Sequence, residues 1–272
     1  MTLRIISFAL LVACLAITSR ARGTAHLTQR NDHLTPIQRE IERQRQRLSS
    51  AEIEERRDAL MRLANLKRPE AARVATAGLR DPAPIVRATA VHAVLSLPQA
   101  EAAALLLPLL QDKLEFVRRE TAYALGETRS RSAVEALSNL VLFDKEAGVR
   151  AAAAIALGQI GDDAGVNPLS QVISGTAAAK GKKKKLSENE FVMRAAAHSL
   201  GQIHSRSSVT VLIAALESET NPNDVRREAA TALGLIGDAS AIPSLRAALG
   251  SADPYLSEAA REALRRLRIA KN

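Results

Sequence analysis

The stretch that decides the fold is VRAAAAIALGQIG, residues 149–161. Alanine and leucine are the strongest helix formers, so most of this stretch is predicted to be helical. Its last residue, Gly161, can adopt the left-handed conformation in which helices commonly end. Asp162 follows and offers a side-chain acceptor to the first backbone N–H groups of a second helix. The stretch therefore predicts a helix, a tight break and the start of another helix.

The same phrase recurs along the chain. A Val-Arg or Met-Arg pair followed by an alanine-rich run is found at Val86-Arg87, Val117-Arg118, Val149-Arg150, Met193-Arg194 and Val225-Arg226. The successive intervals are 31, 32, 44 and 32 residues. Behind the breaks, apolar residues recur at helical spacing, as at Val134, Leu137, Leu140 and Val141. Two short helices cannot bury their apolar faces alone, so the repeat predicts an all-α stack of helical hairpins.

This pattern resembles HEAT repeats of the short kind called PBS-lyase HEAT-like repeats, over roughly residues 49–268. Solenoids of that family carry an aspartate that ends one repeat and an arginine six residues later. The matching pairs are Asp81 with Arg87, Asp112 with Arg118, and Asp144 with Arg150. The resemblance implies a right-handed α-solenoid of about six to seven hairpins, in which these pairs form a ladder between repeats. Such charged pairs are expected to fix register more than to add stability.

The two ends of the solenoid are predicted to be polar caps. Residues 26–48 form a polar N-terminal segment whose helix starts at Thr35-Pro36, a capping box with proline in the first turn. The solenoid proper occupies residues 49–272, and Asp253-Pro254 opens its last helix. A terminal helix with a polar outer face closes a repeat stack against water.

Residues 1–25 read as a secretory signal peptide, with Arg4, an apolar run over residues 5–17 and the small residues Gly23-Thr24-Ala25 near a cleavage site. Export to the periplasm or envelope is therefore expected. Residues 11–14, LVAC, also resemble a bacterial lipobox, which would place a lipid on Cys14. Two alternatives stay open: Cys14 is discarded with the leader, or the apolar run is a buried N-terminal helix.

The long interval holds an insertion at residues 176–190 that interrupts the fourth and fifth repeats. It contributes five lysines, Lys180, Lys182, Lys183, Lys184 and Lys185. The formal net charge of +9 falls to +6 without the three leader arginines, and the insertion supplies most of what remains. It is either an anion-binding loop for an acidic partner or anionic membrane, or a tolerated solvated loop. Nucleic acid is not expected, because no aromatic residues are interleaved with these lysines.

Side chains for catalysis or metal binding form no recognisable pattern in the sequence. The five histidines show no metal-ligand spacing, and His92 and His198 are interpreted as partly buried packing residues. Gly158 and Gly161 lack the strand and the Gly-Lys-Ser/Thr of a phosphate loop. No cofactor is predicted, and the protein is expected not to be an enzyme.

The resemblance implies that the second helices line the inner curve of the solenoid. Positions between their apolar residues are then the predicted partner-binding strip: Leu107, Glu135, Asn139, Asn167, Gln171, Thr210, Ile213 and Arg246. This mixed, mostly uncharged surface suits a protein partner, and the chain is expected to be a monomer. We predict a non-catalytic scaffold or adaptor of the bacterial cell envelope. The alternatives are an enzyme subunit of the bilin-lyase-like type and an attachment protein for anionic surfaces.

Overall fold

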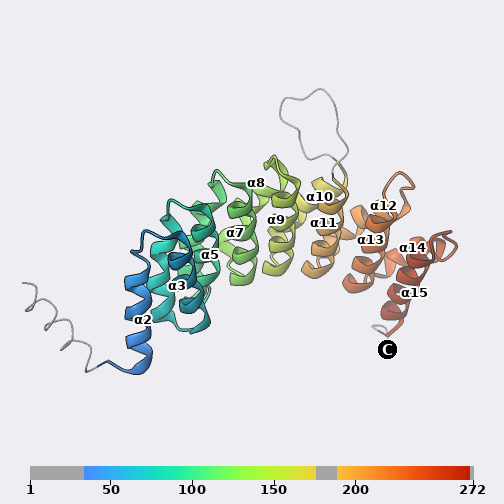
Figure 1. Ribbon diagram of the computed structural model, residues 1–272. Coiled ribbons are helices and arrows are strands. Elements are labelled where there is room, and N and C mark those ends of the chain that lie inside the picture. The colour runs from blue at the N-terminus through green and yellow to red at the C-terminus, as the bar shows by residue number, and fades with distance from the viewer. Residues whose placement is uncertain (1–33, 176–188, 270–272) are drawn as a thin grey trace, which may run out of the picture.

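The computed structural model describes residues 34–175 and 189–269, and in these ranges it confirms an all-α solenoid. The helices stand side by side in one curved stack that runs from the N-terminal to the C-terminal end (Figure 1). No helix in the described ranges is long and apolar enough to cross a membrane.

Each repeat contributes one helix to each of two rows. The first helices of the repeats are α3 (Ile53–Asn65), α5 (Pro84–Ala93), α7 (Glu115–Thr128), α9 (Ala147–Ile160), α11 (Glu190–Ile203), α13 (Asn223–Ile236) and α15 (Pro254–Ile269). The second helices are α4 (Pro69–Ala75), α6 (Gln99–Leu106), α8 (Val134–Phe143), α10 (Val166–Ile173), α12 (Val209–Glu217) and α14 (Ile242–Ala248). Each first helix packs against the next first helix and, from α5 onward, against the second helix of the preceding repeat.

Short 3-10 helices extend the second helices, at the C-terminal end in the first two repeats and at the N-terminal end in the later repeats. In the first two repeats they follow the second helix, as η1 (Thr76–Arg80) and η2 (Leu107–Gln111). In the later repeats they precede it, as η3 (Arg131–Ala133), η4 (Asp163–Gly165), η5 (Arg206–Ser208) and η6 (Ala239–Ala241). The second-helix row therefore has a different shape at the N-terminal end.

The predicted breaks lie where the sequence places them. Gly161 and Gly237 end α9 and α13 with φ of 72° and 76°, in the left-handed region. His204 takes the same conformation at the end of α11, with φ of 59°. Asp162 then caps the next turn, because its side chain accepts a hydrogen bond from the Ala164 backbone N–H at 2.9 Å. These residues end each first helix and begin the turn that leads into the second helix.

Alanine and leucine make up most of the core, and leucine is fully buried in both rows, as at Leu157 in α9 and Leu169 in α10. Neighbouring first helices approach so closely that glycine is needed where they touch. A Cβ added to Gly234 in α13 would lie 2.7 Å from the Ala263 Cα in α15, and one added to Gly201 in α11 would lie 2.9 Å from the Ala232 Cα in α13. Small residues at these positions thus set the distance between repeats.

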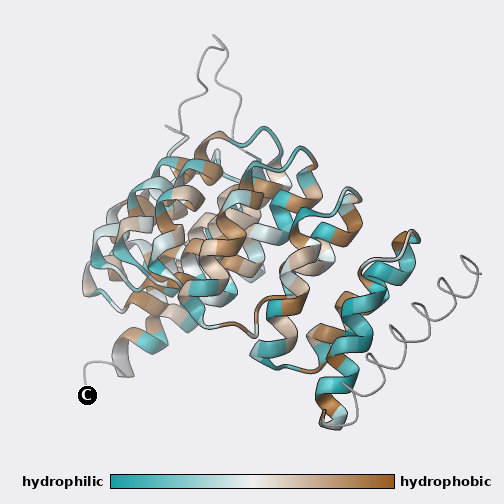
Figure 2. Ribbon diagram, turned by 90° about the vertical axis from the view of Figure 1, so that its left-hand side faces the viewer, coloured by the Kyte–Doolittle hydropathy of each residue, from teal (hydrophilic) through white to brown (hydrophobic). Residues whose placement is uncertain are grey.

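The ends of the solenoid are half repeats. The helix α2 (Pro36–Arg47), the first in the described residues, packs on α3 and α4 in the place of a second helix. Its predicted capping box is confirmed: Thr35 and Gln38 exchange side-chain to backbone hydrogen bonds of 2.9 and 3.3 Å. Figure 2 shows α2, next to the grey N-terminal trace, mostly in the hydrophilic colour. At the other end the last described helix, α15, is a first helix.

The predicted signal peptide and lipobox, with Cys14, lie outside the described residues. So do Lys180 and Lys182 to Lys185 of the insertion. The described chain resumes at Asn189, whose side chain caps α11 by accepting a hydrogen bond from the Phe191 N–H at 2.9 Å. The last residues assigned to the insertion therefore already belong to the start of α11.

Candidate functional site

The predicted ladder between repeats is present, but its partners differ from the predicted pairs. Arg87 does not pair with the Asp81 carboxylate. It donates through Nε and Nη2 to the Asp112 carboxylate of the next repeat, at 2.7 and 3.0 Å, and through Nη1 to the Asp81 backbone carbonyl at 2.8 Å. The Asp81 carboxylate is held instead by Arg56 of the preceding helix, at 2.7 and 2.8 Å. Each arginine thus joins two repeats, because its Nε and Nη2 bind a carboxylate of the next repeat and its Nη1 binds a backbone carbonyl.

The remaining predicted pairs follow the same rule. Arg118 donates to the Asp144 carboxylate at 2.7 and 3.0 Å and to the Asp112 carbonyl at 2.9 Å. Arg150 donates to the Asp144 carbonyl at 2.8 Å. The hydrogen bond from Arg56 holds the pKa of Asp81 below its ordinary value, against the opposing effect of burial. These paired, shielded side chains are structural and are not available to a ligand.

The ladder changes register in α11. Counted back from the glycine that recurs near the end of the first helices, the arginine position of α11 is held by Met193, and Arg194 stands one residue later. Arg194 lies 3.7 Å from Asp224, and its guanidinium lies 5.4 Å from the centre of the Phe191 ring. In the next repeat Arg227, also one residue late, pairs with Asp253 at 2.7 Å. The Met193-Arg194 pair is therefore one residue out of register with the Val-Arg pairs with which the repeat pattern aligned it.

The expected burial of His92 and His198 is also wrong, because both side chains are exposed. Each lies beside a glutamate on the next first helix. His92 Nε2 is 3.1 Å from Glu120 Oε2, and His198 Nδ1 is 2.8 Å from Glu228 Oε1. These two contacts form a second, outer row of polar links between repeats.

The residues of the predicted partner strip lie on the second-helix row, but they do not form one site. Glu135, Asn167 and Gln171 share a shallow groove of about 540 Å³ between α8 and α10. Asn139 lies in a separate hollow between η2 and α8. The rest are distributed over η2, α12 and α14, all exposed or half-buried: Leu107, Thr210, Ile213 and Arg246.

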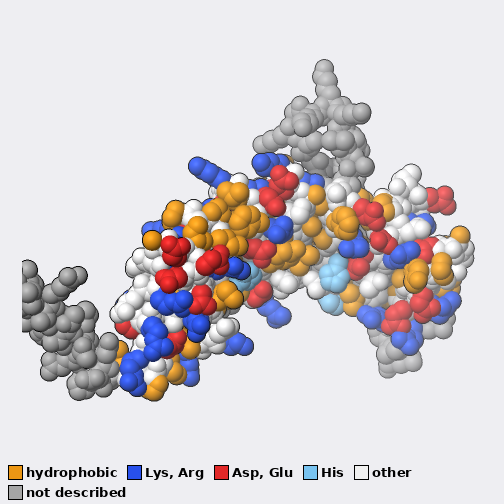
Figure 3. All heavy atoms as spheres, viewed as in Figure 1, with side chains coloured by type: hydrophobic (Ala, Val, Ile, Leu, Met, Phe, Trp, Pro, Cys, Tyr) orange, Lys and Arg blue, Asp and Glu red, His pale blue; other side chains and the backbone are white. Residues whose placement is uncertain are grey.

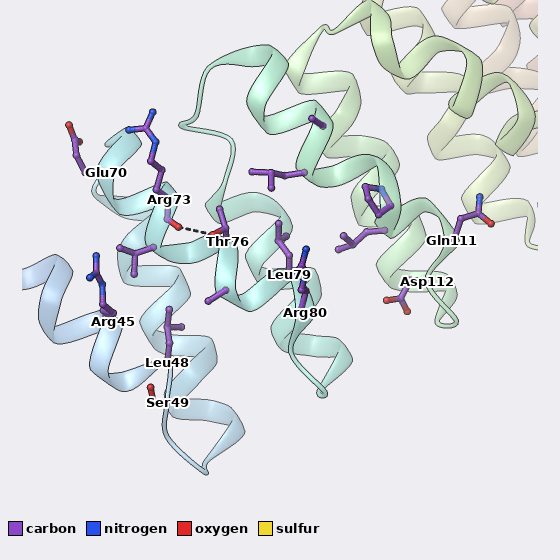
Figure 4. Close-up of a pocket in the computed structure, with 16 residues that line it drawn as sticks. Arg45, Leu48, Ser49, Glu70, Arg73, Thr76, Leu79, Arg80, Gln111 and Asp112 are labelled. Atoms are coloured by element: carbon purple, nitrogen blue, oxygen red, sulfur yellow. Dashed lines mark hydrogen bonds between the residues drawn. The ribbon is translucent and has the colours of Figure 1, made fainter.

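A larger groove, of about 1150 Å³, lies at the N-terminal end of the same row, and the sequence did not predict it. It is formed by α2, by α4 with η1, and by α6 with η2 (Figure 4). We call it the N-terminal groove. Its apolar lining consists of Leu48, Val74, Ala77, Leu79, Ala104, Leu105, Pro108 and Leu109. Four of these eight residues are half-buried and three are exposed, so the groove leaves apolar surface exposed to water.

Three arginines line this groove, one each from α2, α4 and η1: Arg45, Arg73 and Arg80 (Figure 4). Arg45 and Arg73 make only long ion pairs within the described chain, 3.5 Å to Glu42 and 3.4 Å to Glu101. Arg80 makes no ion pair with any described residue. Figure 3 shows further basic side chains over α2 at this end of the molecule. The groove therefore combines an apolar lining with accessible guanidinium groups.

Metal-binding geometry is a separate matter. Within residues 34–175 and 189–269, no three His, Cys, Asp or Glu side chains are arranged to hold a metal ion.

Comparison with known proteins agrees with this architecture. A family model described as HEAT repeats matches residues 41–125, 106–179 and 184–265, well over half of the chain. An engineered protein of known structure is similar over 84% of this chain and 68% of its own, with 21% identity and a TM-score of 0.52. No curated protein sequence matches significantly.

Two natural proteins of known structure are more distantly similar. Human deoxyhypusine hydroxylase is 19% identical, with 85% of this chain and 96% of its own covered and a TM-score of 0.41. A structure of the complex of CpcE and CpcF of phycocyanin lyase from Nostoc sp. is 20% identical, with 88% and 89% covered and a TM-score of 0.47. The family model, the repeat and the solenoid agree, and the chain belongs to the HEAT repeat family.

Proposed function

We propose that this protein is a non-catalytic interaction scaffold that binds a partner protein on its second-helix surface. HEAT repeat solenoids are typical of protein-interaction scaffolds. The observation that carries the proposal is the N-terminal groove, whose half-buried apolar side chains border the unpaired guanidinium of Arg80. Covering such apolar surface contributes about 25 cal/mol per Å² removed from water. Arginine beside an apolar patch is also enriched among residues that dominate binding energies.

We also propose that the scaffold acts in the bacterial cell envelope. The support is the signal-like leader over residues 1–25 and the lipobox-like sequence that ends at Cys14. The intact mass of the mature chain, measured after cell fractionation, tests this. Cleavage near Ala25 or a lipid on Cys14 supports the proposal, whereas a chain in the cytoplasm that keeps Met1 contradicts it.

Affinity capture with matched variants tests the scaffold role. The full chain, a groove variant with Leu105→Gln and Pro108→Ser, and an Arg39→Ala control are each used as bait in extracts of the source cells. Arg39 is exposed on α2 and does not line the groove. We expect one or more proteins to bind the wild type and the control but not the groove variant. Equal recovery of every protein by all three baits would contradict a role for the groove.

Attachment to an anionic membrane surface is a second candidate function, favoured by one edge of the solenoid. Nine large apolar side chains are exposed in the described ranges, and seven lie where second helices end or first helices begin: Ile53, Ile85, Leu114, Phe143, Phe191, Leu249 and Tyr255. Figure 3 shows hydrophobic side chains along this upper edge. The flanks of the lysine-rich insertion, Gly175 and Asn189, lie at the same edge. Lysines and exposed aromatic side chains together favour a lipid headgroup region.

Sedimentation with vesicles tests this second candidate. Vesicles of phosphatidylglycerol are compared with vesicles of phosphatidylcholine at low salt. We expect the wild type to bind only the anionic vesicles, and binding to fall when the five insertion lysines become serine or when Phe191 and Tyr255 become serine. Met61→Ser, at an exposed apolar residue away from this edge, is the control. Unchanged binding of both variants would exclude this function.

A further inference from the structure

We propose that the N-terminal groove binds an extended, acidic segment of a partner protein, with two carboxylates about three to four residues apart and apolar side chains between them. The inference rests on the proposed scaffold function and specifies the chemistry of its ligand. It is argued from the charges of the groove, the spacing of its arginines and the character of its apolar lining.

The groove carries an excess of positive charge. Its lining includes three arginines and two carboxylates, Glu70 and Asp112. Asp112 is neutralised by Arg87, which holds both of its oxygens at 2.7 and 3.0 Å. Arg45 and Arg73 form ion pairs of 3.5 and 3.4 Å with Glu42 and Glu101, which do not line the groove, and Arg80 forms no ion pair with a described residue. A ligand that adds carboxylates balances this charge, and guanidinium binds carboxylate through two parallel hydrogen bonds.

The arginines are spread along the groove and do not converge on one point. Arg73 and Arg80 are seven residues apart on the continuous turns of α4 and η1. A rise of about 1.5 Å per residue in an α-helix and 2.0 Å in a 3-10 helix separates their Cα atoms by roughly 10 to 14 Å along the axis. An extended chain advances about 3.3 Å per residue, so two of its carboxylates three to four residues apart match this separation.

The apolar lining of the groove favours an acidic peptide over a nucleic acid. The half-buried side chains of Val74, Leu105 and Leu109 line the same groove as the charged groups and offer contacts to aliphatic side chains of a ligand. Among the described residues that line the groove none is aromatic. Binding of single-stranded nucleic acid relies on aromatic side chains on which bases stack. The groove is therefore better suited to a peptide than to a nucleic acid.

Fluorescence polarisation with synthetic probes tests the inference on the full chain. The first probe is a fluorescein-labelled peptide with an aspartate at every third position and Leu-Val between aspartates. In the second peptide asparagine replaces aspartate, in the third serine replaces Leu and Val, and the fourth probe is a labelled oligothymidine. We expect the first peptide to bind best, with at least tenfold weaker binding of the other three. Raising the salt concentration should weaken the complex, because its charges lie near solvent.

Arginine variants locate the binding. Arg73→Ala and Arg80→Ala are each expected to weaken the first peptide about tenfold, the usual effect of losing one charge-assisted hydrogen-bonding group. Arg39→Ala, on the outer part of α2, should bind like the wild type. Circular dichroism spectra that match the wild type establish that each variant is folded.

Three results would contradict binding of an acidic peptide in the groove. Equal binding of the asparagine and aspartate peptides, tighter binding of oligothymidine, or equal losses in Arg39→Ala and Arg80→Ala would each overturn the inference. If none of the peptides binds but capture still returns a protein that the groove variant loses, the ligand chemistry is wrong and the scaffold function stands. If capture also returns nothing that depends on the groove, both proposals fall together.

Discussion

Replacing Gly234 with alanine tests whether close helix contact sets the spacing of the repeats. Gly234 is buried within α13, where alanine alone would stabilise the helix by about 1 kcal/mol. The added Cβ would, however, lie 2.7 Å from the Ala263 Cα and 2.8 Å from its Cβ. Carbon atoms are most stable about 3.5 to 4.0 Å apart, so α13 and α15 must separate by about 1 Å. Overpacking of this kind costs about 1 to 3 kcal/mol.

Because the close atom belongs to the backbone of α15 and cannot rotate away, we take the upper end of that range. The expected net loss is then about 2 kcal/mol in the free energy of unfolding, once the propensity gain of alanine is subtracted. Urea denaturation measures it, and amide exchange should show the loss in α13 and α15. Gly148→Ala in α9 is the matched control, since its nearest new neighbour is Arg119 Cδ at 3.9 Å. The reasoning is refuted if Gly234→Ala is as stable as, or more stable than, the wild type.

Three further predictions follow from other contacts. Arg118→Met leaves the buried Asp144 carboxylate without its guanidinium and should destabilise by about 3 kcal/mol in urea denaturation, a loss that Asp144→Asn in the same chain should partly restore. The hydrogen bond from Arg56 lowers the pKa of Asp81 in the folded protein. The contribution of the Asp81 carboxylate to the free energy of unfolding is therefore complete above about pH 4 and is lost as the pH falls through the lowered pKa. Asp81→Asn should flatten the acid limb of a pH titration of stability. His204→Gly should raise the thermal midpoint, because glycine adopts φ of 59° without strain, and a lower midpoint would contradict this.

The sequence was sufficient for the repeat because each hairpin is specified locally. The alanine-rich run, the left-handed residue at Gly161 and the cap at Asp162 lie within a few residues of each other, and the structure confirms all three. The aspartate and arginine of the ladder were also identified, but their partners were not. Six residues of chain separate Asp81 from Arg87, whereas the carboxylate that Arg87 binds is 25 residues away. Which of two neighbours an arginine reaches depends on how repeats stack, and the stacking is not a local property.

The site was harder to predict than the fold. The N-terminal groove exists because α2 stands in the second-helix row and because η1 and η2 follow their helices there, unlike the 3-10 helices of later repeats. No single motif encodes that difference. One signal was present in the sequence, since Arg73 and Arg80 fall on one side of a helix whose partner α2 is itself rich in arginine. The predicted strip treated all second helices as equivalent and so missed the end at which they are not.

The half repeats at the two ends bear on how the length of such a molecule can change. Among the described residues, α2 is a second helix and α15 is a first helix, and every first helix from α5 to α13 packs between two other first helices. Duplicating one unit, such as the 31 residues from Val86 to the residue before Val117, would lengthen the stack and leave both ends chemically unchanged. The N-terminal groove would keep its two flanking repeats. Gene duplication can therefore change the length of the solenoid without changing the N-terminal groove.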